Sequence, residues 1–122
     1  MASSLAPRIQ AFKAGADLRA LQYTIVKLSA LDTVIGSGAN EKAEGILMNA
    51  PNIGETAEVA VAGGALLKVA STVGIGLSFA SGAAGVGAAA TSGQWALGVF
   101  QDAGVSGDIV PVIIDRHTAG AV

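Results

Sequence analysis

The chain has 122 residues, a formal net charge of −2 and no cysteine. Its seven basic residues form no run, so the sequence lacks the cationic patch with which a protein neutralises nucleic-acid phosphates. The absence of cysteine excludes a disulfide framework and thiolate chemistry. We expect a chain of this length to fold as one domain around a modest hydrophobic core.

Alanine and glycine together supply 42 of the 122 residues, while the aromatic residues number only five. Burial of apolar surface contributes roughly 25 cal/mol per Å², so an alanine-rich core stabilises a fold little per residue. We therefore expect a marginally stable monomer that contacts with other copies stabilise, in a homotrimer or a higher homo-oligomer.

Residues 1–15 are interpreted as an extended arm, and residues 16–122 as a single β domain. The arm carries large apolar side chains without a strand or helix rhythm, and exposed apolar groups usually mark a binding surface. The candidate attachment residues are Leu5, Pro7, Arg8, Ile9, Phe12 and Lys13. A frayed terminus is the alternative interpretation. No basic stretch precedes an apolar run here, so we expect no secretory signal and synthesis in the cytoplasm.

Short strand patterns and turn signals alternate after the arm. Residues 16–20 fit a short helical turn or the entry to a strand. Strands are predicted at 22–28, 31–35, 45–48, 55–61, 65–69, 95–100 and 109–114, with turns or loops at 36–40, 49–54, 81–85 and 101–108. Gly63-Gly64 predicts a tight hairpin, and Pro111 predicts an edge strand or a bulge. This rhythm is typical of an all-β protein, either a small antiparallel β-barrel or a β-sandwich.

The segment from Val69 to Gln101 contains 33 residues and no charge. Large side chains alternate with small ones at Val73, Ile75, Leu77 and Phe79, which indicates a strand and not a membrane helix. We expect neighbouring subunits to cover this segment and Trp95 to be at least partly buried beside it. A membrane-active role for residues 73–90 and a small ligand-binding barrel stay open as alternatives.

Few residues offer a pattern for catalysis. Gly85 to Ala90 formally fits a dinucleotide-binding fingerprint, but the turn-forming residues that follow favour a glycine-rich β-turn. His117, the single histidine, follows Asp115 too closely along one strand for a Ser/His/Asp triad with Ser106. No carboxylate cluster accompanies it, so we expect no enzyme activity, no metal site and no cofactor.

Charged residues in two places are interpreted as solvated faces that also suit subunit boundaries, where ion pairs at the rim set register. The possible subunit contacts are Glu41, Lys42, Glu44, Asp115, Arg116 and His117.

Three stretches carry a family resemblance: residues 16–28, residues 43–64 with the run GILMNAPNIGETAEVAVAGG, and residues 102–115. Together they resemble the capsid cement, or head decoration, proteins of tailed phages, over about residues 16–118. The resemblance implies a small β-rich, β-tulip-like protein without catalytic residues.

The same resemblance implies a homotrimer on the outer capsid surface of the virion. There it would bridge subunits of the major capsid protein and stabilise the icosahedral head against the pressure of packaged DNA. The N-terminal arm would be the capsid-binding element. Neither nucleic acid nor a membrane is expected as a partner.

Overall fold

The computed structural model describes residues 7–39, 41–91 and 94–118. Regular structure in this part of the chain is β-strand apart from one 3-10 turn, as the fold class predicted from the sequence requires. The elements are β1 (Arg8–Ala14), β2 (Ile25–Ala30), β3 (Thr33–Gly36), β4 (Gly45–Leu47), β5 (Thr56–Lys68), β6 (Ser78–Ser81), η1 (Ala83–Gly85), β7 (Gly87–Ala89), β8 (Trp95–Phe100) and β9 (Ile109–Thr118).

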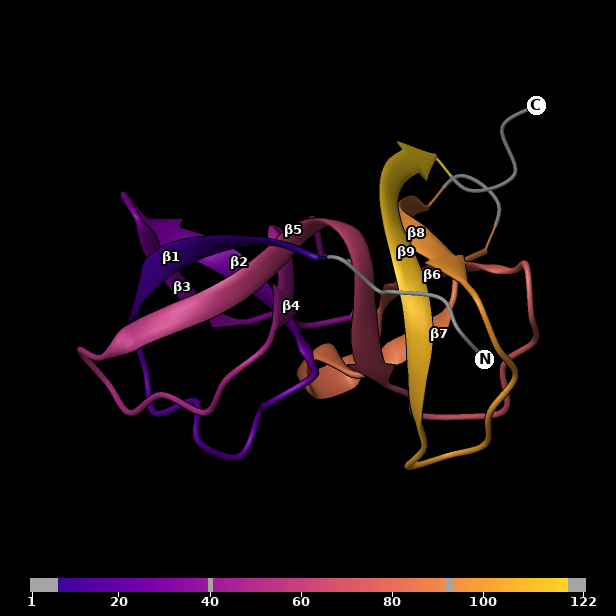
Figure 1. Ribbon diagram of the computed structural model, residues 1–122, viewed down its shortest axis with the longest axis horizontal. Helices are drawn as coiled ribbons and strands as arrows, with labels where there is room; N and C mark the ends of the chain where they lie inside the picture. The colour runs from indigo at the N-terminus through magenta and orange to yellow at the C-terminus, as the bar shows by residue number, and fades with distance from the viewer. Residues whose placement is uncertain (1–6, 40, 92–93, 119–122) are drawn as a thin grey trace.

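Two sheets share the long strand β5 and form two halves that lie side by side (Figure 1). In the N-terminal half, the order β1-β3-β2-β4-β5 is closed by antiparallel pairing of β1 with β5, which makes a five-stranded barrel. In the C-terminal half the order is β5-β9-β8-β6-β7. A single bridge between Val69 and Gly87 brings the end of β5 to β7, so this sheet also curls back on itself.

The predicted hairpin at Gly63-Gly64 is wrong, because both glycines lie inside β5. Residues 56–62 pair with β1, while residues 63–68 pair with β9. Gly63 has a φ of +77°, a conformation that costs residues with a side chain about 1–2 kcal/mol. The two glycines therefore let one strand bend from the first sheet into the second, instead of reversing the chain.

The predicted arm is also corrected, because residues 8–14 form β1 of the barrel. Residues 8–13 pair with residues 56–62, and Ala14 lies opposite Val34 of β3. Phe12 is 6% exposed and belongs to the barrel core with Leu18, Val26, Val34, Leu47 and Val59. The structure thus shows no boundary between an arm and a domain at residue 15.

The core of the C-terminal half contains two of the three phenylalanines. The rings of Phe79 and Phe100 have centroids 5.5 Å apart and pack with Leu67, Val69, Leu97, Val110 and Val112. Trp95 is partly buried at the start of β8, which confirms the expectation for this side chain.

Two other local predictions differ from the structure. Residues 16–20 form neither a helical turn nor a strand but part of the loop between β1 and β2. The alternation over residues 73–79 does not place its large residues on one face, because Gly76 turns the chain with a φ of +81°. Ile75 and Leu77 are consequently 70% and 49% exposed.

Pro111 lies in a strand paired on both sides, contrary to the predicted edge strand. Its carbonyl accepts a hydrogen bond from the backbone N–H of Gln101, one residue beyond the end of β8. The N–H and C=O of one strand residue point to the same side. The missing N–H of Pro111 therefore faces the place where β8 ends, and an internal strand tolerates the proline there.

We predict that Phe12→Ala lowers the free energy of unfolding by about 3 kcal/mol, because it leaves a cavity in the barrel core. Ile9→Ala on the same strand, where the side chain is 42% exposed, is the control and should cost less than about 1 kcal/mol. Urea unfolding followed by circular dichroism measures both. Equal small effects would mean that β1 is a detachable arm.

Candidate interaction surfaces

The loop before β4 holds several of the charged residues predicted as subunit contacts. Glu41 forms an ion pair with Lys27 of β2, with 2.6 Å between Oε2 and Nζ. The hydrogen bond from Lys27, with a second one from the backbone of Gly38, lowers the pKa of Glu41. Both acidic oxygens of this predicted contact residue thus have partners within the chain.

The same loop reaches across to the C-terminal half. The Nζ atom of Lys42 lies 5.2 Å from the ring centroid of Trp95 in β8. Glu44 pairs with Arg116 of β9 at 3.8 Å, and the Arg116 guanidinium also donates to the Glu44 backbone carbonyl. At the start of the loop, the carbonyl of Gly38 accepts a hydrogen bond from the Ser81 hydroxyl at 2.8 Å.

These contacts assign residues 37–39 and 41–44 a role inside the molecule, as a strap that fastens the barrel to the second sheet. The two ion pairs are partly exposed, so each contributes roughly 0–1 kcal/mol. The sequence predicted these residues as contacts between subunits, whereas the contacts described here lie within one chain. Their partners in β8 and β9 lie 50 or more residues later in the sequence. No local sequence pattern therefore indicates these contacts.

Asp115 and His117 lie in the last part of β9, where His117 is opposite Ala96 and its side chain is outside the described atoms. Ser106 precedes β9 in the loop at the other end of the strand. At about 3.3 Å per residue, the six steps along the strand from Ile109 to Asp115 separate these groups by about 20 Å. The structure therefore brings no triad together.

Most of the residues predicted for attachment lie in β1, which is a strand of the barrel. Arg8, Ile9 and Lys13 are exposed and Pro7 is half-buried, whereas Phe12 is a core residue and Leu5 lies outside the described residues. β5 covers one edge of this strand. On the other edge, only Lys13 and Ala14 pair with β3.

This second edge leaves a row of backbone groups open. The N–H of Lys13 donates to Asp32 across that edge, and the N–H of Ala14 donates to Glu55 on the opposite side. By strand alternation, the N–H and C=O groups of Ile9 and Ala11 point to the open edge, where no strand of the described chain pairs with them. A shallow cavity of about 380 Å³, lined by Phe12, Lys13, Asp32 and Glu55 among others, lies at the end of this edge.

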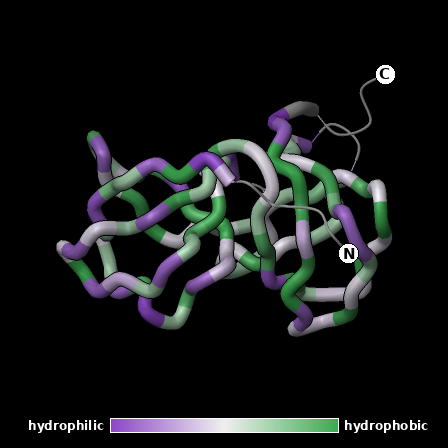
Figure 2. The backbone as a smooth tube through the Cα atoms, in the orientation of Figure 1, coloured by the Kyte–Doolittle hydropathy of each residue, from purple (hydrophilic) through white to green (hydrophobic). Residues whose placement is uncertain are grey.

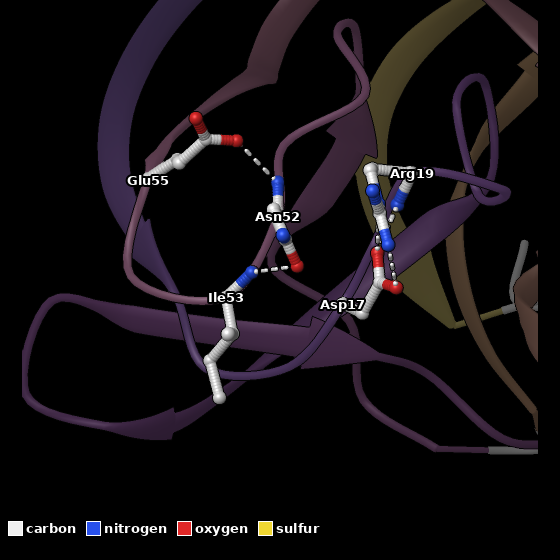
Figure 3. A network of polar contacts seen from close by, with 5 residues as sticks. All are labelled: Asp17, Arg19, Asn52, Ile53 and Glu55. Carbon is white, nitrogen blue, oxygen red and sulfur yellow. Dashed lines mark hydrogen bonds and ion pairs between the residues drawn. The ribbon is translucent and has the colours of Figure 1, made fainter.

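A polar network shapes the loops at the end of the barrel (Figure 3). Two side-chain nitrogens of Arg19 donate to the Asp17 carboxylate, at 2.9 and 2.8 Å. These bonds lower the pKa of Asp17 to about 2. In the neighbouring loop the backbone N–H of Asn52 donates to Glu55, and the Asn52 side chain accepts from Ile53. Each network satisfies backbone or charged groups of its own turn.

The outer face of the second sheet is apolar, which sequence reasoning missed. Register places residues 66, 109, 111, 113 and 99 of three adjacent strands on the side away from the core. Ile109 and Ile113 are 49% and 38% exposed. We call this surface the apolar face, and it consists of Leu66, Val99, Ile109, Pro111 and Ile113. The sequence pattern that could have revealed this surface is the unbroken apolar run from Ile109 to Ile114. Such a run is typical of a strand buried on both faces.

The described residues include no group of three or more His, Asp or Glu side chains placed to hold a metal ion. Within residues 7–39, 41–91 and 94–118 there is also no helix with the length and apolar character of a membrane span. The glycine pair of the formal dinucleotide fingerprint ends η1 and begins β7.

We predict that the stability of Asp17→Asn falls less steeply at acidic pH than that of the parent protein. Because folding lowers this pKa from 3.8 to about 2, the Asp17 carboxylate stabilises the fold above pH 3.8, and this stabilisation is lost as the pH falls towards 2. Urea midpoints measured between about pH 7 and pH 2 should fall less in the variant than in the parent protein. Asp32→Asn is the control, since Asp32 forms no ion pair within the described chain. Parallel curves for parent protein and Asp17→Asn would contradict the prediction.

No protein-family model matches the chain, and no curated protein matches it. Among solved structures, the fold is similar to the crystal structure of the head fiber gp8.5 N base in bacteriophage phi29. The TM-score is 0.74 at 14% sequence identity, over 93% of this chain and 98% of that chain. The likeness extends over nearly the whole of both chains and establishes a common fold.

Proposed function

We propose that this protein is a structural, non-enzymatic component of a phage head, a cement protein on the outer capsid surface that bridges major capsid protein subunits. The observation that carries the proposal is the likeness in fold to the base of a phage head fibre, over almost the full length of both chains. The sequence resemblance to head decoration proteins supports the same assignment from different evidence.

The physical action of such a protein is mechanical. Packaged DNA pushes outward, and the shell fails when neighbouring capsomers separate. A homotrimer that touches several subunits adds contacts that must break first. Because many copies decorate one shell, weak contacts at each copy add up through multivalency. A rigid all-β body with two closed or nearly closed sheets suits this task, since it transmits load without refolding.

The open edge of β1 is the attachment element in this proposal. Main-chain groups on a strand edge bind an extended segment of another protein without a deep pocket, and adjacent side chains give specificity. Ile9 and Ala11 offer the backbone groups, while Arg8 and Lys13 offer charge at the two ends. Phe12 contributes indirectly, by anchoring β1 to the barrel core.

The alternatives of a ligand-binding barrel and a membrane-active segment receive less support. Core side chains, among them Phe12, Val34 and Leu47, fill the closed barrel where a ligand pocket would have to lie. In the segment proposed to act on membranes, Phe79 and Ala80 are buried in β6. Exposure of those residues to lipid would require the second sheet to unfold.

We predict that the purified protein co-sediments with expanded heads and not with precursor shells, because bridging needs the outer lattice of the mature shell. Sedimentation through a density gradient, followed by protein staining of the head fractions, measures the occupancy. The proposal would be overturned if the protein bound neither expanded heads nor precursor shells. It would also be overturned if the protein bound liposomes as well as it binds expanded heads.

We predict that Ala11→Pro weakens head binding by about tenfold or more, because proline removes the outward N–H of β1 and obstructs an added strand. The matched control is Ala11→Val, which keeps the N–H at the same exposed position. Circular dichroism verifies that both variants keep the parental fold. Equal head occupancy of the two folded variants would assign attachment to another surface.

A further inference from the structure

The apolar face is unusual for an antiparallel sheet with one side packed on a core. Such sheets normally alternate apolar residues inward with polar residues outward. Here β9 is apolar in both directions, because Val110, Val112 and Ile114 are buried while Ile109 and Ile113 are exposed. Val99 lies opposite Ile113 on one side, and Leu66 lies opposite Pro111 on the other. The exposed area therefore extends over three strands and is not a single stray side chain.

The neighbouring residues Gly64 and Val105 carry no charge. Gly64 of β5 lies opposite Ile113, so no side chain stands between β9 and an approaching surface there. Val105 is 56% exposed in the turn that leads into β9, where its carbonyl accepts from Asp108. Contiguous exposed apolar surface of this kind usually marks a protein contact.

We infer that the apolar face is the surface through which copies of this chain associate with one another. The inference rests on the proposed function only in that a bridging protein is expected to be oligomeric. It names the contact surface and the partner, a second copy of the same chain.

Charge distribution favours a second copy as the occupant. Eleven of the 16 charged residues precede Gly63, and Figure 2 shows hydrophilic segments gathered on the N-terminal half. The β1 edge, flanked by Arg8 and Lys13, therefore suits a polar partner, whereas the apolar face suits a surface as uncharged as itself. Two copies of this face meet without burying a charge at the centre, which would be costly.

The rim of the apolar face carries both signs of charge. Lys68 lies opposite Ile109 and forms no ion pair within the described residues. Asp102 and Asp108 are exposed in the loop at the same end of β9. In an association through this face, Lys68 of one copy has carboxylates of the neighbouring copy available as partners. Such pairs contribute little affinity but favour one register over others.

The test is sedimentation velocity of the isolated protein over about 1 to 100 μM, the range in which associations of moderate affinity dissociate. The parent protein should be oligomeric. Ile113→Glu and Ile109→Glu should raise the concentration of half-dissociation by about tenfold or more, because each places a charge at the centre of the contact. Leu31→Glu and Ile53→Glu are the matched controls, since both side chains are more exposed, at 89% and 64%, but lie on loops of the N-terminal half.

A second measurement covers the case in which a glutamate variant fails to fold. Because the chain has no cysteine, Ile109→Cys and Leu31→Cys each introduce one unique site for a nitroxide label. Dipolar broadening of the electron paramagnetic resonance spectrum at residue 109, without broadening at residue 31, supports the inference.

Three results would overturn the inference: a monomeric parent protein, equal association of all four glutamate variants, or broadening at residue 31 alone. If the face variants remain oligomeric and instead lose binding to heads, the apolar face contacts the shell and the inference is wrong. Head binding is measured separately by co-sedimentation. The proposed function therefore fails or holds on its own result, independently of the contact surface between copies.

Discussion

The continuity of β5 through Gly63 and Gly64 is the constraint on which both halves of the molecule depend. The first part of this strand closes the barrel by pairing with β1, and the second part begins the other sheet by pairing with β9. A residue with a side chain at Gly63 would strain the bend, since its φ is +77°. The two cores are therefore coupled through one backbone, and separation of the halves requires β5 to break.

The strap formed by residues 37–39 and 41–44 reinforces the same junction from outside. Contacts of Gly38, Lys42 and Glu44 reach residues of β6, β8 and β9 respectively. The contacts of Lys42 and Glu44 are individually weak, because water competes at these partly exposed sites. Together with the shared strand they hold the two halves in one arrangement, which the proposed bridging function would require.

The two halves present different chemistry to their surroundings. The barrel carries most of the charge and an open strand edge, whereas the outer face of the second sheet is apolar at its centre. Our proposals assign the first surface to the shell and the second to other copies of the chain. This division agrees with the thin alanine- and glycine-rich core, since association through the second sheet adds apolar burial that one copy lacks.

The sequence by itself determined the all-β class, the positions of β4, β8 and the start of β9, and the partly buried Trp95, because local alternation and turn residues encode strands directly. Only the tertiary structure decided which strands pair. Gly63-Gly64 suits a turn or a bend equally well, and distant pairing with β9 selected the bend. Likewise Phe12 has no apolar rhythm around it and becomes a core residue because β1 pairs with β5. Strand partners and the faces they leave exposed depend on contacts between residues far apart in the chain, which local periodicity does not specify.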